Sequence, residues 1–309
     1  MKNNQHNLKL LLLLLPLLLI LIAAILPKML DFEGRGSQKV EPDKFNGARA
    51  YEDLQRQVAF GPRTPGSNAH LRTRQYICSV LIMSGWSCEI QNREYLGKKV
   101  INVVARSGDS GEKWIILGAH YDSRIFADQD PDLISRGKAV PGANDGASGV
   151  SVLLELGRVL PTYHGLIPNR QIWLVFFDAE DNGSIPGWEW IMGSRVFVLN
   201  LRDEPDAVVV IDMIGDKDLK IYQEKRSSKL LNNEIWSAAA EIGLATIFVP
   251  EEKYSILDDH IPFLEKGIPA IDIIDFDYPH WHTTLDLPDK VSPDSLQAVG
   301  DTLLYWLTH

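Results

Sequence analysis

Cysteine is scarce in this chain of 309 residues, and its scarcity excludes one kind of metal site. The two cysteines, Cys78 and Cys88, do not form a C-x-x-C pair, so a structural zinc site with four cysteine ligands is excluded. In a domain outside the cytoplasm the two thiols could pair as one disulfide. Two buried free thiols are the alternative, and the sequence leaves both open.

Positive charge is also in deficit, because 31 lysines and arginines stand against 41 aspartates and glutamates. The formal net charge of −10 opposes attraction to a phosphate backbone, so no nucleic acid is expected as a partner. Internal repeats are absent, and the leucine-rich N-terminus is the one low-complexity tract. The hydrophobic fraction of 45% is ordinary and sufficient for one sizeable core.

A long apolar run is present at the N-terminus, from Leu10 to Pro27, after Lys2 and Lys9. About 18 helical residues at roughly 1.5 Å each nearly span a bilayer core of roughly 30 Å. The run is long for a signal peptide and no clear A-x-A cleavage site follows, so residues 1–30 are predicted to form an uncleaved signal anchor, a single transmembrane helix. The positive flank predicts that the remaining chain is extracytoplasmic and membrane-anchored. A cleaved signal, which would give a secreted protein, is the alternative.

The rest of the chain is expected to be one α/β domain, residues 47–309, after a polar linker at residues 31–46. Apolar runs alternate with segments of helical periodicity, which predicts a mostly parallel central sheet covered on both faces, a three-layer α/β/α sandwich. Strands are expected at residues 100–105, 113–119, 171–177, 207–214, 219–223 and 270–274. Helices are expected at residues 51–58, 70–83, 149–160, 228–242 and 294–308.

Histidines and carboxylates follow the predicted strands, at the sheet edge where α/β proteins bind ligands. The residues concerned are His120, Asp145 in a glycine-rich turn, Glu180, Asp181, Asp212 and His282. One such residue would be an ordinary loop cap, but several buried carboxylates repel one another unless a cation neutralises them. Mixed histidine and carboxylate ligands favour zinc with a position left open for substrate.

Glu180 and Asp181 are adjacent carboxylates for which different tasks are available. One can bind metal while the other acts on the substrate as general acid and base. The alternative is an acidic loop exposed to water. The buried strand before the pair, and Gly183 and Pro186 after it, argue against that alternative.

At these residues the chain resembles the superfamily that unites the zinc aminopeptidases of family M28 and the glutaminyl cyclases. The resemblance extends from about Ala48 to the C-terminus. It is carried by the ordered segments GAHYDSR, GANDGASGVSVLLELGRVL, FFDAEDNG with the later GSR, VVVIDMIG, DDHIPFLEKGIPA and WHTTLDLPDKV. The resemblance implies a zinc-exopeptidase-like fold, in which the mostly parallel central sheet is mixed, and a zinc-dependent enzyme.

The resemblance also implies a role for each matching residue. The implied zinc ligands are Asp145, Asp181 and His282, with His120 and Asp212 as ligands of a second zinc in the peptidases. Glu180 matches the catalytic general acid/base. In the cyclases Asp212 and Asp258 match members of an acidic hydrogen-bond network.

Two branches of the superfamily remain open. The resemblance implies one zinc ion for a glutaminyl cyclase and two for an aminopeptidase. Glutaminyl cyclases convert the N-terminal glutamine of peptides to pyroglutamate and release ammonia, whereas the aminopeptidases hydrolyse the first peptide bond. Trp281 before His282 and the run from Asp258 to Leu264 resemble the cyclase form, with Trp188 or Trp190 as a second wall of the substrate pocket. We therefore expect a glutaminyl-peptide cyclotransferase, with an aminopeptidase as the alternative. A non-enzymatic, membrane-anchored binding domain is a third hypothesis, and the intact Glu180 and His282 argue against it.

Three positions depart from the pattern of the cyclases. Asp181 stands where a glutamate is usual, so the metal must lie closer to the backbone or the strand end must shift. Leu257 lacks the polar character expected from animal cyclases, and Asp272 stands where those enzymes carry a histidine.

Overall fold

The structure is a computed structural model that describes residues 42–107, 113–163, 167 and 170–309. Its folded body begins at Asp43. The predicted anchor, residues 1–30, lies outside the described residues. Within the described ranges no helix is both long and apolar enough to cross a bilayer. Phe45, expected in the linker, is buried in the core, so the folded body begins slightly before the predicted boundary.

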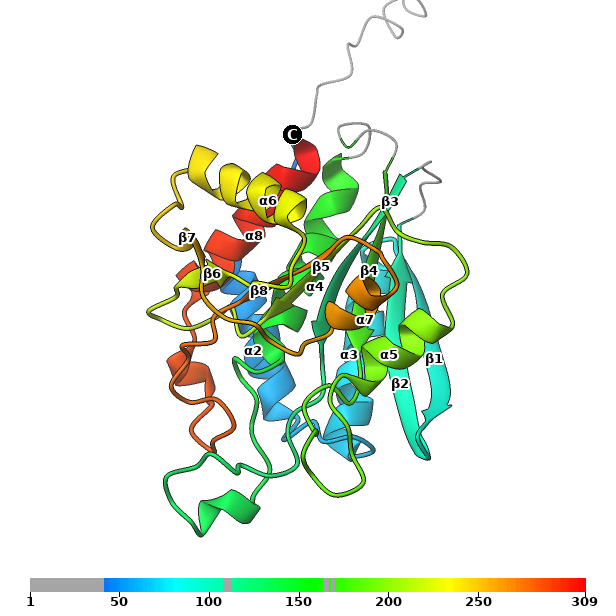
Figure 1. The fold of residues 1–309 in the computed structure, drawn as a ribbon, viewed down its shortest axis with the longest axis vertical. Helices are drawn as coiled ribbons and strands as arrows, with labels where there is room; N and C mark the ends of the chain where they lie inside the picture. Colours follow the sequence, from blue (N-terminus) through cyan, green and yellow to red (C-terminus); the bar gives the residue numbers. More distant parts are fainter. Residues whose placement is uncertain (1–41, 108–112, 164–166, 168–169) are drawn as a thin grey trace, which may run out of the picture. The chain divides into compact units, whose positions relative to one another are not determined.

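A six-stranded mixed sheet forms the centre of the folded body, with the strand order β1-β2-β4-β3-β5-β8 (Figure 1). Its strands are β1 (Ser87–Tyr95), β2 (Lys98–Arg106), β3 (Lys113–His120), β4 (Arg170–Phe177), β5 (Ala207–Asp212) and β8 (Ala270–Ile274). The pairs β1–β2 and β2–β4 are antiparallel, and the remaining pairs are parallel. The prediction of an α/β fold with a mixed central sheet is confirmed.

Side chains alternate between the two faces of this sheet, as the pleat of a strand requires. On β3, Leu117 belongs to one buried cluster and Ile116 to another, and Leu174 and Val175 on β4 divide in the same way. Both faces are therefore apolar, which explains why these strands read as continuous hydrophobic runs.

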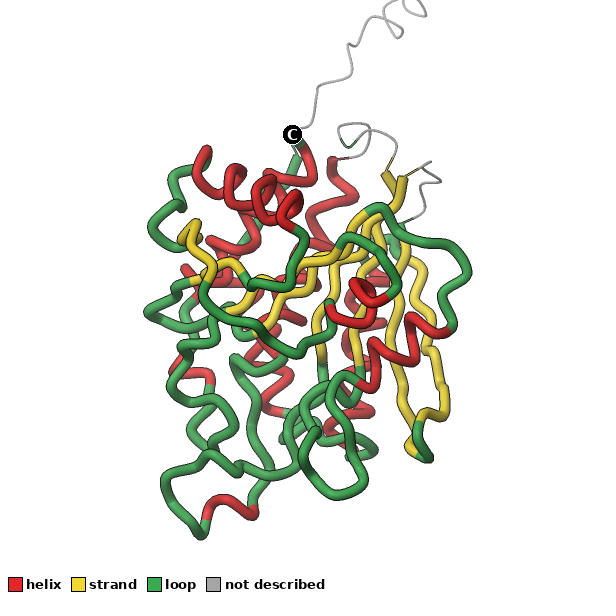
Figure 2. Tube along the Cα trace, viewed as in Figure 1, coloured by secondary structure: helices red, strands yellow, loops and turns green. Residues whose placement is uncertain are grey.

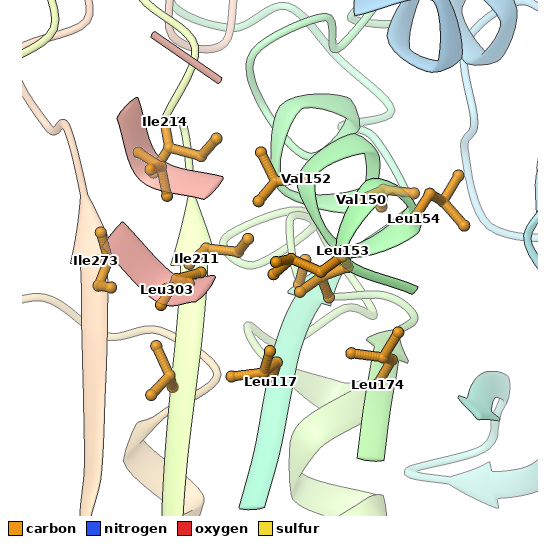
Figure 3. Packing of buried hydrophobic residues seen from close by; sticks show 14 of the residues in the cluster. Leu117, Val150, Val152, Leu153, Leu154, Leu174, Ile211, Ile214, Ile273 and Leu303 are labelled. Carbon is orange, nitrogen blue, oxygen red and sulfur yellow. The ribbon is translucent and has the colours of Figure 1, made fainter. Parts of the chain in front are cut away.

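Helices cover both faces of the sheet. They are α2 (Gly47–Ala59), α3 (Asn68–Met83), α4 (Ala147–Val159), α5 (Met192–Leu199), α6 (Lys229–Glu241), α7 (Ile261–Glu265) and α8 (Pro293–Thr308). The larger cluster joins the sheet to α2, α3, α4, α6 and α8, and Figure 3 shows Leu153 and Leu303 of two of these helices among its side chains. The smaller cluster joins the opposite face to α5 and α7 through Phe197 and Phe263.

Among the α-helices and β-strands of the described residues, four were not expected from the sequence. They are β1, α5, α7 and β7 (Phe248–Glu252). β1 is an edge strand with mostly exposed, polar side chains, so it lacks an apolar run. The strand expected at residues 219–223 forms as β6 (Ile221–Gln223), but it pairs with β7 in a separate two-stranded sheet.

Cys78 on α3 and Cys88 on β1 form a disulfide, with their Cα atoms 5.6 Å apart. Of the two alternatives that the sequence left open, the structure has the disulfide. It ties the edge strand to a helix that packs against the sheet. β1 is continued into β2 by a tight turn at Leu96 and Gly97, both with positive φ, as a two-residue hairpin turn of type I′ requires.

The carboxyl ends of β3, β4, β5 and β8 lie at one edge of the sheet because these strands are parallel. Figure 2 shows that the chain leaves β3 and β4 in loops rather than directly in α-helices. These loops, with those that follow β5 and β8, carry the candidate site.

Candidate metal centre and active site

Two buried trios of ligating side chains share Asp145 at the carboxyl edge of the sheet. We call Asp145, Asp181 and His282 the first trio, and His120, Asp145 and Asp212 the second trio. In each trio the potential ligand atoms all lie within 4.8 Å of one another. Every residue predicted to bind metal is thus brought together, while the ligand roles themselves stay a prediction.

The first trio has the donor atoms that a cation needs. Nε2 of His282 lies 2.7 Å from Oδ1 of Asp181 and 3.8 Å from Oδ2 of Asp145. The Oδ2 atoms of Asp145 and Asp181 are buried, and no residue within the described part of the chain donates a hydrogen bond to them. Buried carboxylate oxygens are normally paired, so these two fit a cation. One imidazole and two carboxylates also suit zinc.

The second trio is held by direct contacts between its members. Nε2 of His120 lies 3.0 Å from Oδ1 of Asp212 and 3.1 Å from Oδ1 of Asp145. Gly146, with φ at +91°, allows this approach, because a Cβ there would lie 2.7 Å from the His120 ring. The Asp212 oxygen also accepts the backbone N–H of Met213.

Burial and mutual repulsion shift the pKa values of the acids in this site. Burial raises the pKa of Asp181 to about 6 and that of Asp212 to about 7, with neighbouring carboxylates adding to both shifts. Burial also raises the pKa of Glu180 well above its usual range, reinforced by Asp258 and Asp181. For His282, burial lowers the pKa, but the charge of Asp181 and its other acidic neighbours raise it to about 9. Such a concentration of acids would be relieved by a divalent cation.

Strained backbone occurs beside the ligands. Ala179, Ile191, Met213 and His282 all have φ between +46° and +55°, in the left-handed region that non-glycine residues seldom adopt. Each costs about 1–3 kcal/mol, and such strain persists where the surrounding structure determines it. Each of these residues is next to a predicted site residue or, for His282, is one itself.

Two buried aspartates that the sequence analysis left without a role hold the ligand-bearing loops. Asp122 accepts the backbone N–H of Glu180 at 3.1 Å and an N–H of the Asn182 side chain at 3.1 Å. Asp286 accepts the backbone N–H of Asp145 at 3.1 Å. Both lie within the segments that carry the family resemblance, but an orienting aspartate has no pattern of its own in a sequence.

A cavity of about 250 Å³ opens beside the first trio. Its volume is below the roughly 300–1,000 Å³ of pockets for drug-sized ligands. It is lined by Asp145, Glu180, Asp181, Trp190, Asp212, Met213, Tyr254, Ser255, Ile256, Leu257, Asp258, Ile274, Phe276 and Trp281. The carboxylates therefore face a small chamber with apolar and aromatic walls.

Two of the three predicted pocket tryptophans, Trp190 and Trp281, line the cavity, and both stack with the imidazole of His282. The ring of Trp281 stacks on that imidazole with centroids 3.6 Å apart, and Trp190 lies parallel to it at 6.0 Å. Of the two alternatives for the second tryptophan, Trp190 lines the cavity and Trp188 does not. The ring of Trp188 lies under the Lys98 ammonium, 4.5 Å away, and packs in a small cluster with Val100.

Glu180 and Asp258 both lie at the cavity wall, as expected of residues that act on a substrate. Glu180 is 7% exposed, and no described residue donates a hydrogen bond to its carboxylate, which leaves the group free for a substrate proton. Asp272, on β8, is buried, and neither of its carboxylate oxygens receives a hydrogen bond from the described part of the chain. Leu257 is 45% exposed and lines the cavity.

This chain is similar in fold and sequence to glutaminyl cyclases and to a Zn-dependent exopeptidase. The glutaminyl cyclase of Porphyromonas gingivalis superposes with a TM-score of 0.80 at 32% identity, covering 86% of this chain and 98% of that one. A Zn-dependent exopeptidase from Parabacteroides distasonis superposes with a TM-score of 0.79 at 30% identity, covering 86% of this chain and 99% of that one. The glutaminyl-peptide cyclotransferase-like protein of Bos taurus is 25% identical over 289 residues, covering 79% of this chain and 71% of that one.

The profile described as Peptidase family M28 matches residues 102–307, a range that holds every residue of both trios and the whole cavity lining. The match covers more than half of the chain. This chain belongs to peptidase family M28.

Proposed function

We propose that this protein is a zinc-dependent glutaminyl-peptide cyclotransferase that converts the N-terminal glutamine of peptides to pyroglutamate. The observation that carries the proposal is the small cavity whose lining combines Glu180, two carboxylates of the first trio, and the rings of Trp190 and Trp281. A chamber of this size suits one terminal residue, and a bound residue would displace water from it. Cyclisation does not consume water. The names of the cyclase relatives support the same reaction.

The cyclisation requires a proton carrier, and Glu180 is placed for that task. The α-nitrogen of the substrate forms a bond to the γ-carbonyl carbon, and the bond from that carbon to the amide nitrogen breaks. The Glu180 carboxylate takes a proton from the α-amine and returns it to the departing ammonia. A pKa raised by burial suits a group that must both accept and release a proton near neutral pH.

Asp212 and Asp258 are proposed to orient the substrate amine and Glu180 from the cavity wall. Asp145, Asp181 and His282 would hold the zinc ion. When bound, zinc would supply Lewis-acid polarisation of the γ-carbonyl. Trp190 and Trp281 would enclose the glutamine side chain and keep water away.

We propose a single zinc ion, held by the first trio. The free oxygens of Asp145 and Asp181 belong to this trio, whereas Oδ1 of Asp212 already accepts the Met213 N–H and contacts His120. Membership of family M28 and the zinc-dependent neighbour support zinc as the cation. A second zinc at His120 and Asp212 would instead favour an aminopeptidase.

The reaction is tested by incubating purified protein with a glutaminyl peptide and, separately, with aminoacyl-anilides. Cyclisation predicts ammonia release from the first substrate without loss of its first residue, and little release of aniline from the second. Release of free amino acids would establish the aminopeptidase alternative and overturn the proposal. If neither product forms, a non-enzymatic binding domain is favoured instead.

We further propose that residues 1–30 anchor the protein and that the catalytic domain, residues 47–309, is extracytoplasmic. The apolar run with its positive flank supports an anchor. The Cys78–Cys88 disulfide supports an oxidising compartment. Fractionation of cells into membrane and soluble parts, with protease added from outside, tests both statements. A soluble, protease-protected chain would contradict them.

A further inference from the structure

Arg124 is a buried arginine at the end of the segment GAHYDSR, and the proposed reaction gives it no role. It is 2% exposed. A buried guanidinium is costly unless several acceptors surround it, and its planar, five-donor shape can bridge several groups at once. Arg124 reaches three different parts of the candidate site.

The first contact of Arg124 leads to His282 through Asp128. Nε and Nη2 of Arg124 donate to Oδ1 and Oδ2 of Asp128, at 3.0 and 2.5 Å. Oδ1 of Asp128 lies 3.5 Å from Nδ1 of His282, on the side of the ring away from Asp181. The N–H of Gln129 donates to the His282 carbonyl at 3.2 Å. A carboxylate beside the second nitrogen of a metal-binding histidine fixes its ring orientation and tautomer.

The second contact leads to the backbone of Asp181. Nη1 of Arg124 donates to the Asp181 carbonyl at 2.8 Å, and Nη2 donates to the Gly183 carbonyl at 3.2 Å. Because an aspartate has one methylene fewer than a glutamate, its carboxylate follows its backbone closely. Fixing the carbonyl of Asp181 therefore also fixes the oxygen that faces His282.

The third contact leads to the aromatic wall. The guanidinium carbon of Arg124 lies 5.0 Å from the centroid of the Trp190 ring, within the range of a cation–π interaction. Trp190 lines the cavity and lies parallel to the His282 imidazole. The same guanidinium thus supports a pocket wall and two members of the first trio.

We propose that Arg124 is a positioning residue that holds His282, through Asp128, together with the Asp181 backbone and Trp190 in a single geometry. It sets zinc affinity through the first two contacts and substrate affinity through the third. This inference rests on the proposed zinc site, but not on which reaction that site performs.

The test compares the wild type with Asp128→Asn, Arg124→Lys and the double variant. Zinc dissociation constants are measured by competition with a chelator, and KM and kcat for a glutaminyl peptide are measured at saturating zinc. Asp128 has a side chain that is 41% exposed, so its variant is expected to fold. Arg158→Lys is the matched control, because Arg158 pairs with Asp53 and Glu155 near the far end of α4.

Asp128→Asn is expected to weaken zinc binding about 10- to 100-fold with KM nearly unchanged. Arg124→Lys is expected to weaken zinc binding similarly and also to raise KM, because lysine cannot bridge three groups. The double variant should bind zinc no more weakly than Arg124→Lys, since both changes break one chain of contacts. Arg158→Lys should change neither quantity.

Folded variants with the zinc affinity and KM of the wild type would overturn the inference and leave the proposed function standing. A lowered melting temperature with unchanged zinc affinity and unchanged KM would also overturn the inference, because it would show a purely structural role. If Arg124→Lys does not fold, an unchanged zinc affinity in Asp128→Asn is sufficient to overturn it. A wild type that binds no zinc would overturn the inference and the proposed function together.

Discussion

Nε2 of His282 lies 2.7 Å from Oδ1 of Asp181, and the neighbouring Oδ2 of Asp181 is buried without a donor from any described residue. Burial lowers the pKa of His282, but the charge of Asp181 and hydrogen bonds to its acidic neighbours raise it to about 9. A metal ion that takes the same imidazole nitrogen must displace its proton.

Zinc binding at neutral pH is therefore expected to release about one proton from His282, with a smaller contribution from Asp181, whose pKa is about 6. The raised pKa keeps the ring protonated below about 9, so apparent zinc affinity should rise with pH and level off near that value. Calorimetry in two buffers of different ionisation enthalpy measures the released protons. An enthalpy independent of the buffer would contradict this assignment. His309→Gln, a change at the exposed C-terminal residue, should behave as the wild type.

Glu180→Gln is expected to lower kcat by about 10²- to 10⁴-fold, because the proton carrier is removed. Zinc content should be unchanged, since Glu180 belongs to neither trio. The raised pKa of Glu180 also places the acidic limb of the wild-type kcat/KM profile above the usual range of a glutamate, because the base must be ionised to accept a proton. Activity within tenfold of the wild type would rule out this role.

Gly183→Ala is expected to displace Trp190, because a Cβ at residue 183 would lie 2.1 Å from ring atoms of that tryptophan. The expected result is a KM raised about tenfold, equivalent to about 1.4 kcal/mol of lost binding, with zinc retained. Gly137→Ala is the matched control, because a Cβ there meets nothing within 4 Å. Equal KM values for the two variants would show that Trp190 does not contact the substrate.

Glu224 should stabilise the fold in a pH-dependent way. Burial opposes its ionisation, but hydrogen bonds from His260 and from backbone N–H groups lower its pKa to about 2. A folded-state pKa below the unfolded value stabilises the fold fully above about pH 4.5, and the contribution is lost as the pH falls toward 2. Glu224→Gln should cost about 3 kcal/mol in the free energy of unfolding at pH 7, and less at pH 3.

Urea denaturation at both pH values measures this difference. The exposed Glu251, changed to glutamine, serves as the control and should leave the free energy of unfolding unchanged. A cost for Glu224→Gln that is the same at pH 7 and pH 3 would show that ionisation of Glu224 does not matter.

The central strands and the assembly of the site could be predicted because both depend on local patterns. Continuous apolar runs such as residues 171–177 are visible in a sequence, and parallel strands necessarily bring the residues that follow them to one edge. His120, Asp181 and Asp212 converge for that reason. Which of Trp188 and Trp190 lines the cavity depends instead on the conformation of the loop that carries both residues, and a local pattern does not predict that conformation.

The supporting contacts could not be predicted, because they depend on distances between loops. Arg124 and Asp286 look like ordinary loop residues in the sequence, yet each holds a ligand-bearing segment through backbone atoms. β1 was also not predicted, because most of its side chains are exposed and it therefore has no apolar run in the sequence. The disulfide at Cys88 ties this edge strand to α3.

The sharing of one zinc ion by Asp145, Asp181 and His282 underlies the proposed function. Its most direct test is the zinc content of the purified protein and of Asp181→Asn and Asp212→Asn, measured by native mass spectrometry with zinc in slight excess. One zinc ion per chain is expected in the wild type and in Asp212→Asn, and none in Asp181→Asn. Two zinc ions in the wild type, or a zinc retained by Asp181→Asn, would contradict it.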